Sequence, residues 1–579
     1  MEPSTSSERS VPNPAVPRDD VAALRQLSRA IELQQHGRLD DAERVYAALL
    51  AVDDTDPTLL VNAGALSLAR NDIATSVARL ERAVAVAPEN AIAQGNLGFA
   101  LIRAGRDAEA LVTLDRAVAL KPGFAQAHNN RGIALVRLRR RDEAIAAFER
   151  ALAVQPAFVD AAINLGEVHN RAGDTRRARD AFSRVPPGHP AFASARVGLA
   201  FADALDGALG PATSALESLV AEQPKLVAAW HTLGAVRNWA WRHDEAERAF
   251  RQALALDPTH ADARFGLASA LLARGRYAEG FDAFDASRAN AAPRAGVLGT
   301  LPPWRGDALD GTLVVHGEQG LGDVVQFARF IAGARPRVRR IVVLLDGYWR
   351  PLAPLFATLG SVDAVISDAN ALPAEAPRAR VSVLSLARLV DADIDSLPAP
   401  PYLSAPQDRR ASWRDTVGRF AAPRVGLAWS VFARDDHGYV SRHKSIAPEA
   451  LAPILDIEGV SFFSLQPGVA GDTARLGTHA SRVVGSGASI GDFGDTAALI
   501  DALDLVISVD TAVAHVAGAL AKPVWLLERF HGCWRWRAHA ERSPWYPTLR
   551  LFRQDRFDDW RDAIARVARA LQAWRDTRG

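Results

Sequence analysis

Prolines recur at a fixed interval through the first half of this chain. They stand at positions 88, 122, 156, 190, 224 and 258, each 34 residues after the last. Small residues keep the same period: Gly64, Gly98, Gly132, Gly166, Ala200, Gly234 and Ala268. Each period also holds two amphipathic helical stretches, such as AIAQGNLGFALIRAG and DAEALVTLDRAVALKP. Because small residues let two helices approach closely and a proline ends the second helix, the pattern predicts stacked helix pairs.

This pattern resembles that of tetratricopeptide repeat (TPR) proteins. We expect about eight repeats over residues 22–294, preceded by a disordered tail at residues 1–21. Such arrays form superhelices whose concave face generally binds an extended peptide. The resemblance therefore predicts a protein or peptide partner in the groove of the array.

An asparagine series follows the same 34-residue spacing. It consists of Asn62, Asn96, Asn130 and Asn164, and it ends where positions 198, 232 and 266 are Gly, Thr and Gly. Stacked carboxamides can hold a peptide backbone without reading its side chains. The nucleocytoplasmic O-linked N-acetylglucosamine transferases have a similar ladder. The structural alternative is that asparagine is common at this repeat position without a ligand.

The second half of the chain has a different pattern. A linker at residues 295–310 precedes short β-branched runs that alternate with helical segments. Apolar strands alternating with helices predict parallel sheets covered on both faces. A proline-rich break, SLPAPPYLSAPQD, divides this half, so we expect two α/β units at residues 311–405 and 422–579 with a cleft between them. The predicted fold class is α plus α/β, a helical solenoid followed by two Rossmann-like units.

Bulk composition restricts the function. The formal net charge is +1, from 68 basic and 67 acidic residues, which provides no electrostatic footprint for nucleic acid or an anionic membrane. One cysteine, Cys533, excludes an internal disulfide and a four-cysteine zinc site. No apolar run reaches 18 residues, and the N-terminus lacks an apolar signal segment. We therefore expect a cytoplasmic protein without membrane insertion.

The strongest site candidate lies in LVISVDTAVAHVAGAL, residues 505–520. A buried strand ends at Asp510 and Thr511, and a helix begins at once. Its free amides and dipole favour a diphosphate, Thr511 adds a hydroxyl, and His515 lies one turn further on the same face. The structural alternative is a simple helix N-cap.

A second candidate is the polar loop WSVFARDDHGYVSRHKSI, which follows the strand RVGLAWS. It contains Arg434, Arg442, His443 and Lys444, whose charges would neutralise a nucleotide leaving group without a metal. The chain has only four lysines, so Lys444 stands out in a loop where arginine is the usual cation. A solvated surface loop is the alternative.

The third candidate is the glycine loop HGEQGLGD. Gly317, Gly320 and Gly322 lead into Asp323 at the start of a helix. A glycine-rich turn of this kind usually cradles a phosphate. With the nucleotide expected in the second unit, the glycines instead let the chain pass close to the cleft, and Asp323 projects into it as a general base. Helix capping is the alternative role for Asp323.

Taken together, HGEQGLGD, RHKSI, SLQPG, SVDTAVAHVAGAL and SPWYP resemble the heptosyltransferase-type (family nine) glycosyltransferases found fused to bacterial TPR arrays. The resemblance implies a GT-B fold and sugar transfer from a nucleotide-sugar donor with no metal and no other cofactor. It implies Asp323 as the base for the acceptor hydroxyl. It also implies donor-binding roles for Arg442, Lys444, Asp510, Thr511, Ala512 and His515. Ala512 replaces a glycine of the family motif, so the backbone there approaches a phosphate less closely.

Weaker candidates remain in the second half. Asp391 and Asp393 form a D-x-D, which we interpret as solvated. The aromatic run at residues 532–547 could stack on a sugar or pack between the two units. Gly494, Asp495 and Thr496 are expected to start a helix near the base pocket.

Three functional hypotheses follow. The first is a glycosyltransferase whose array selects a protein or peptide acceptor. The second is a TPR interaction scaffold with a catalytically inactive transferase-like domain, which Ala512 and the short first unit favour. The third is an enzyme with a saccharide or lipid-linked acceptor, whose array recruits a partner.

Overall fold

The computed structural model describes residues 20–288, 296–372, 374, 377–390, 399–431, 443–466, 475–485, 489–536 and 540–577. The chain divides into two compact units, Met1–Ala202 and Asp203–Gly579. Residues 1–19 of the predicted tail lie outside the described residues. The predicted domain limits stay a prediction.

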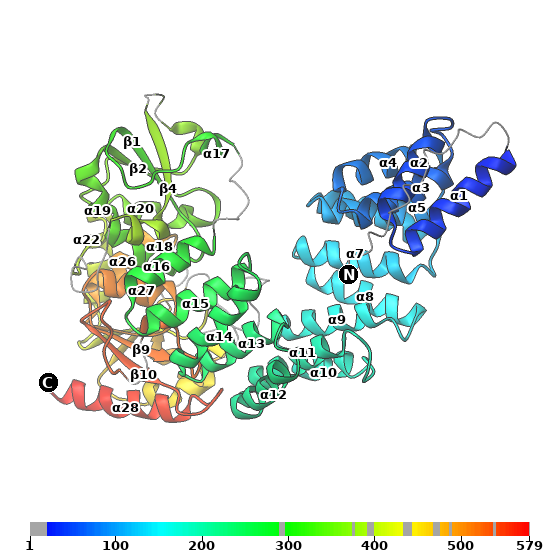
Figure 1. The fold of residues 1–579 in the computed structure, drawn as a ribbon. Coiled ribbons are helices and arrows are strands. Elements are labelled where there is room, and N and C mark those ends of the chain that lie inside the picture. The colour runs from blue at the N-terminus through cyan, green and yellow to red at the C-terminus, as the bar shows by residue number, and fades with distance from the viewer. Residues whose placement is uncertain are drawn as a thin grey trace, which may run out of the picture. The chain divides into compact units, whose positions relative to one another are not determined.

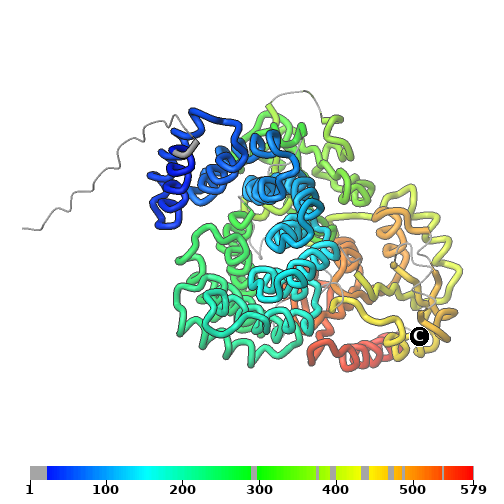
Figure 2. Tube along the Cα trace, turned by 90° about the vertical axis from the view of Figure 1, so that its right-hand side faces the viewer, coloured from blue at the N-terminus to red at the C-terminus, as the bar shows by residue number. Residues whose placement is uncertain are grey.

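Over the described residues 20–288, successive helices form the repeat region (Figures 1 and 2). They are α1 (Asp20–Gln35), α2 (Leu39–Leu50), α3 (Pro57–Ala69), α4 (Ile73–Val86), α5 (Ala91–Arg103), α6 (Asp107–Leu120), α7 (Ala125–Arg137), α8 (Arg141–Val154), α9 (Val159–Ala172), α10 (Thr175–Phe182), α11 (Phe192–Leu205), α12 (Leu209–Glu222), α13 (Val227–Trp239), α14 (His243–Leu256), α15 (Ala261–Ala273) and α16 (Tyr277–Ala286).

The periodic small residues have the packing role that the sequence predicts. A Cβ at Gly64 would lie 2.6 Å from Cγ of Leu80, and a Cβ at Gly234 would lie 2.7 Å from Phe250. The partner is in each case 16 residues later, on the second helix of the pair. Glycine therefore lets the two helices of a repeat pack at a distance that a side chain would prevent.

The turn inside each repeat has a left-handed residue, again every 34 residues. The series is Gly37, Asn71, Gly105, Arg139, Gly173, Gly207, Trp241 and Gly275, with φ between +60° and +83°. The left-handed conformation costs a residue with a Cβ roughly 1–2 kcal/mol, which explains the glycines. Trp241, with φ +61°, is the bulkiest member of the series.

The second compact unit contains two parallel sheets. The first has β1 (Leu309–His316), β2 (Val338–Leu344), β3 (Ala364–Ile366) and β4 (Arg378–Ser382) in the order β3-β2-β1-β4. The second has β5 (Arg424–Ala428), β6 (Ser461–Ser464), β7 (Val483–Val484), β8 (Leu505–Val509), β9 (Val524–Glu528) and β10 (Leu549–Arg553) in the order β10-β9-β8-β5-β6-β7. The predicted fold class is confirmed, although β4 and β7 are strands that the sequence analysis did not identify.

Helices cover these sheets and form the cleft between them. Those near the site are α18 (Leu321–Phe327), α26 (Phe493–Ala502) and α27 (Ala512–Ala519), while α28 (Arg561–Asp576) packs against β10. Each sheet consists of parallel pairs, so the carboxyl ends of its strands share one edge. None of the helices in the described part of the chain has the length and apolar character that a membrane-spanning helix needs.

The last repeat belongs to the same hydrophobic core as the first sheet. Tyr277, Phe281 and Phe284 of α16 are buried together with Phe327 of α18 and with Trp545. The ring of Tyr277 meets that of Trp545 edge to face at a centroid distance of 5.7 Å. The carboxyl-terminal helices of the array are thus packed together with the α/β fold within the second compact unit.

Candidate active site

The candidate site lies where the strand order of each sheet reverses direction. In the second sheet the chain runs from β5 to β6 and β7 on one side, and then returns to β8 on the other side of β5. In the first sheet the same reversal lies between β1 and β4. Ligands of open α/β sheets bind beyond the carboxyl ends of the strands at such switch points.

Asp510 follows β8 and is ion-paired in the interior. Its Oδ2 accepts a hydrogen bond from Lys444 Nζ at 2.6 Å, and its Oδ1 lies 3.9 Å from His515 Nε2. Burial by itself would raise the pKa of Asp510, but the charge of Lys444 and the nearby His515 outweigh it and hold the pKa well below its usual range. The structure thus brings together Lys444, Asp510 and His515 from two separate predicted motifs.

Thr511 begins helix α27. Its hydroxyl accepts a hydrogen bond from the Val513 amide at 3.2 Å and lies 3.2 Å from Ser508 Oγ. This is the N-cap arrangement of the structural alternative. Because both Thr511 and Ala512 also line the cavity described below, capping and ligand binding are compatible here.

His515 is buried behind the helix start. Its Nδ1 lies 3.0 Å from the Tyr546 hydroxyl, and its ring stacks on Trp536 at a centroid distance of 5.5 Å. Burial is the main cause that lowers the pKa of His515 to about 4, against a favourable effect of Asp510 on the charged form. The imidazole is therefore neutral near pH 7.

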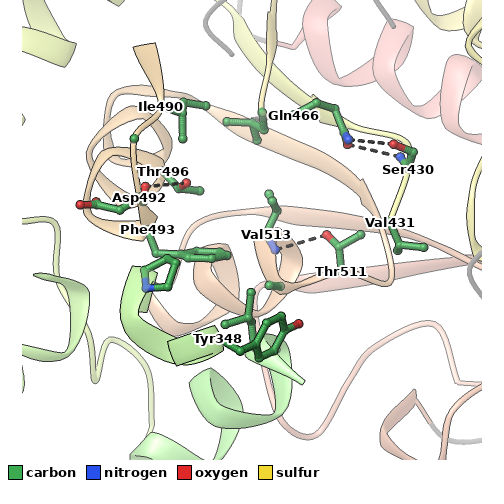
Figure 3. Close-up of a pocket in the computed structure, with 16 residues that line it drawn as sticks. Tyr348, Ser430, Val431, Gln466, Ile490, Asp492, Phe493, Thr496, Thr511 and Val513 are labelled. Carbon is green, nitrogen blue, oxygen red and sulfur yellow. Dashed lines mark hydrogen bonds between the residues drawn. The ribbon is translucent and has the colours of Figure 1, made fainter. Parts of the chain in front are cut away.

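A cavity of about 390 Å³ lies at the switch point of the second sheet (Figure 3). Its lining comes from both α/β halves, with Leu321, Gly322 and Tyr348 from the first half. Figure 3 shows Tyr348 across the cavity from Gln466. The rest of the lining is Pro351, Ser430, Val431, Leu465, Gln466, Ile490, Gly491, Asp492, Phe493, Thr496, Thr511, Ala512 and Val513.

Gln466 and Ser430 are lining residues that the sequence analysis did not select. Gln466 Oε1 accepts from the amides of Trp429 at 3.0 Å and Ser430 at 3.3 Å, and Nε2 donates to Ser430 Oγ at 2.8 Å. A polar residue directly after the apolar strand SFFSL is the signal that could have identified Gln466. Thr496 follows the start of α26, which begins at Phe493 with Asp492 as its N-cap.

The glycine loop brings the first half against α27. A Cβ on Gly322 would lie 2.7 Å from His515 Cδ2 and 3.4 Å from Ala512 Cα, and one on Gly317 would lie 2.7 Å from the Trp349 ring. Glycine at position 322 is therefore what allows α18 and α27 to approach so closely.

Asp323 lies in the first turn of α18 at this junction. Its Oδ2 accepts from the Gly320 amide at 3.0 Å, which is the capping contact of the structural alternative. Its Oδ1 accepts from Arg535 Nη2, which also forms an ion pair with it. Arg535 is buried, donates to Gln326 and contacts Cys533 Sγ at 3.0 Å. Arg535 and Asp323 are 212 positions apart, and no local sequence signal identifies this pair.

A second cavity of about 980 Å³ lies at the switch point of the first sheet. It is lined by His316 at the end of β1, Ser382 at the end of β4, and Trp349 beside the glycine loop. Helix α16 of the last repeat contributes Asp282 and Asp285 to its wall. Glu318 and four arginines complete the charged lining, the arginines being Arg288, Arg305, Arg380 and Arg388.

The predicted asparagine series occupies equivalent positions on α3, α5, α7 and α9. Asn130 Oδ1 accepts from Gln126 Nε2 at 3.2 Å, and Asn164 Nδ2 donates to Asn129 at 2.9 Å. Among the described residues, the side chains of Asn62 and Asn96 have no such protein partner. The peptide-binding role of the series stays a prediction.

Several predicted positions fall outside the site or outside the described residues. Arg434, Arg442, Asp391 and Asp393 lie outside the described residues. His443 is described, and its Nδ1 lies 2.8 Å from Asp558 Oδ1. In the aromatic run, Trp536, Trp545 and Tyr546 are almost completely buried, which favours the packing interpretation for these three rings.

The fold and the site define a class of protein, a helical repeat array joined to a pair of Rossmann-like units with a cleft between them. Comparison with known families agrees with this class. Tetratricopeptide repeat profiles match residues 67–130, 129–194 and 242–293. The profile of glycosyltransferase family 9 (heptosyltransferase) matches residues 491–530, which include Asp510, Thr511 and His515. The chain thus matches tetratricopeptide repeats in its N-terminal half, and residues 491–530 of its C-terminal half match glycosyltransferase family 9.

Individual relatives were also found. Protein FlbA of Caulobacter vibrioides is 30% identical over 335 residues, which cover 53% of this chain and 54% of FlbA, so the match spans about half of that relative. A tetratricopeptide repeat protein from Parabacteroides merdae is 16% identical, with a TM-score of 0.37, and covers 42% of this chain and 97% of that chain. PilF of Pseudomonas aeruginosa is 17% identical, with a TM-score of 0.33. The match covers 36% of this chain and 96% of that chain.

Proposed function

We propose that this protein transfers a sugar from a nucleotide-sugar donor to a protein or peptide that the TPR array selects. The matches to tetratricopeptide repeats and to glycosyltransferase family 9 support a transferase joined to a protein-binding array. The donor, the acceptor and the roles of individual residues are parts of the proposal.

The observation that carries the proposal is the start of α27 beside an open cavity, with the Lys444–Asp510 ion pair directly before it. Free amides at a helix N-terminus and the dipole of the helix favour a diphosphate. The Lys444 ammonium lies next to this point, where it donates to Asp510 at 2.6 Å. A donor diphosphate placed against Thr511 and Ala512 would be neutralised by Lys444, and the cavity of about 390 Å³ would receive the rest of the nucleotide.

The proposed chemical step uses Asp323 as a general base. The acceptor hydroxyl gives its proton to the Asp323 carboxylate, and its oxygen forms a bond to the anomeric carbon of the sugar. The bond between that carbon and the phosphate oxygen breaks, and its electron pair leaves with the nucleoside diphosphate. General-base assistance of this kind contributes about 10²–10⁴-fold to the rate. Arg535 and the Gly320 amide keep the carboxylate oriented.

The acceptor side of the proposal rests on the second cavity. It is lined by the last residues of β1 and β4, and α16 of the array forms part of its wall. A peptide that leaves the array at its carboxyl-terminal repeats would thus meet the first sheet at its switch point.

Calorimetric titration with UDP-, GDP-, ADP- and dTDP-sugars tests the donor site. We expect saturable binding of one class, and loss of that binding in Asp510→Asn. Lys444→Ala leaves the Asp510 carboxylate buried without its partner, which typically lowers the free energy of unfolding by about 3–5 kcal/mol. The double variant Lys444→Ala/Asp510→Asn has no unpaired charge at this position, so it separates an effect on binding from an effect on folding. Lys225→Ala, at an exposed lysine of the array, is the matched control. Unchanged binding in the double variant would contradict the proposal.

The scaffold alternative has one observation in its favour. Arg535 is ion-paired with the carboxylate that would have to accept the proton. A folded protein that binds none of the four donor classes would support a TPR scaffold with an inactive transferase-like domain.

A further inference from the structure

Trp241 occupies an unusual position in the seventh repeat. It forms the turn between α13 and α14, where the other repeats have Gly, Asn or Arg in the left-handed conformation. A bulky residue at positive φ is an outlier, and such an outlier points to a role elsewhere in the structure. The contacts of the indole ring identify that role.

The ring lies against the segment that follows β9. Trp241 Nε1 donates to the Phe530 carbonyl at 3.3 Å, and the Arg553 guanidinium lies 4.6 Å from the ring centroid. Gly532 has no space for a Cβ, because the Trp241 ring and the Glu528 carboxylate occupy it. Trp239 stacks on His531 at a centroid distance of 5.0 Å and an interplanar angle of 16°.

The contacts continue from this segment to the candidate base. Glu528 Oε1 accepts from the Cys533 amide at 3.0 Å. Cys533 Sγ in turn contacts Arg535 Nη1 at 3.0 Å, and Arg535 Nη2 holds Asp323. A continuous series of contacts therefore joins the turn of the seventh repeat to the Asp323 carboxylate at the start of α18.

We propose that Trp241 is a positioning residue, and that the seventh repeat is a brace that holds residues 530–535 so that Arg535 orients Asp323. The catalytic consequence rests on the proposed function, whereas the structural consequence does not. The repeats nearest the cleft thus have a second role besides binding a partner: they complete the active site.

The substitution Trp241→Gly tests the brace without straining the repeat. Glycine suits the left-handed turn and is the residue found in five other repeats, so the array keeps its fold. The only cysteine of the chain, Cys533, lies in the braced segment and is half-buried, so its thiol reports on that segment. We expect the full-length variant to keep a cooperative thermal transition and to react with 5,5′-dithiobis(2-nitrobenzoic acid) about tenfold faster than the parent protein.

Arg139→Gly is the matched control, because Arg139 has the same turn position and the same φ of +61° in the other compact unit. Its thiol reactivity should equal that of the parent. Trp241→Phe keeps a ring but not the indole donor, and we expect an intermediate rate. Gly532→Ala disturbs the same contact from the opposite side and should also expose the thiol.

Kinetics distinguish positioning from general destabilisation. The substrate is the UDP-, GDP-, ADP- or dTDP-sugar that binds, and its hydrolysis is measured. We expect Trp241→Gly to lower kcat at least about tenfold. KM for the donor should stay unchanged, because the contact between Lys444 and Asp510 does not involve Trp241 or residues 530–535. Unchanged thiol reactivity in both Trp241→Gly and Gly532→Ala would overturn the brace. Increased reactivity in a protein that hydrolyses no donor would leave the brace standing and reject the proposed function. Increased reactivity with KM raised and kcat unchanged would reject the positioning role.

Discussion

Asp510 is buried between Lys444 and His515, which come from different segments of the chain. Each of the three side chains depends on its surroundings for its charge state or its position. The carboxylate needs a cation in the interior, the ammonium needs an anion to stay near the cavity, and the imidazole stays neutral through burial. The site is therefore one electrostatic cluster, and changes to single residues should be measured against folding as well as activity.

A single substitution at Asp323 tests its proposed role as the general base. Asp323→Asn keeps the size of the side chain and the contact with the Gly320 amide, but it removes the proton acceptor. We expect kcat for sugar transfer to fall about 10²–10⁴-fold with donor affinity unchanged. Asp310→Asn, at an exposed aspartate near the start of β1, is the control. A variant with near-parent kcat would leave Asp323 with the capping role alone.

The pKa of His515 predicts how stability depends on pH. Burial lowers this pKa to about 4 from an ordinary value near 6.5, so between these values the unfolded chain binds a proton that the folded chain does not. The free energy of unfolding should therefore fall as the pH drops through this window. The charged groups Asp510, Arg535, Asp323 and Lys444 act on the imidazole.

Urea unfolding of the parent protein and of His515→Gln between about pH 7 and about pH 4 measures this contribution. We expect the variant to lose about 2–3 kcal/mol less than the parent over that range. Parallel loss of stability in the two proteins would show that His515 titrates normally in the folded state.

At the scale of elements, the cleft depends on two short helices whose first turns meet. Helices α18 and α27 come from different α/β halves, and they pack against each other through Gly322, His515 and Ala512. The candidate base lies on one helix and the candidate donor site on the other. The distance between the two helices therefore sets the geometry of the proposed transfer.

A single methyl group should change that distance. In Gly322→Ala the new Cβ would lie 2.7 Å from His515 Cδ2, so α18 must move away from α27 or the imidazole must shift. Overpacking of this kind costs typically 1–3 kcal/mol. We expect lower stability in urea and weaker donor binding by calorimetry. Gly360→Ala, where a Cβ has no neighbour within 4 Å, should behave as the parent. Equal behaviour of the two variants would mean that the helices are not constrained by this contact.

At the scale of the whole molecule, the repeats are divided between the two compact units. The asparagine series lies in the first compact unit, whereas the last repeats lie in the second unit with both sheets. The proposed peptide-binding series and the proposed brace therefore belong to different compact units.

The double variant Asn62→Ala/Asn96→Ala tests this division, because these two side chains have no hydrogen-bond partner among the described residues. Loss of two hydrogen bonds to a peptide at about 1 kcal/mol each should raise KM for protein acceptors roughly tenfold or more, with donor hydrolysis unchanged. Transfer of labelled sugar to cell-extract proteins provides the measurement, with Gln155→Ala as the control. An unchanged rate of protein labelling would show that the asparagine series does not bind the acceptor.

The sequence by itself determined the repeat array, the parallel sheets and the local motifs. Proline spacing, small residues at close helix contacts and strands ending in polar residues are local signals, because the forces that produce them act within one helix pair or one strand. For the same reason Lys444, Asp510, Thr511, His515 and Asp323 could be selected in advance. The strands β4 and β7 were not identified, since RARVS and VV are too short or too polar to show a strand pattern.

Only the tertiary structure decided which of these residues meet. The pairs Lys444 with Asp510 and Arg535 with Asp323 join positions 66 and 212 residues apart. The array residue Trp241 reaches Phe530 across 289 positions. Such contacts depend on how sheets and helices pack, and packing is a sum over many weak interactions that no short pattern encodes. The sequence therefore contains the parts of the proposed active site, and the packed fold assembles them.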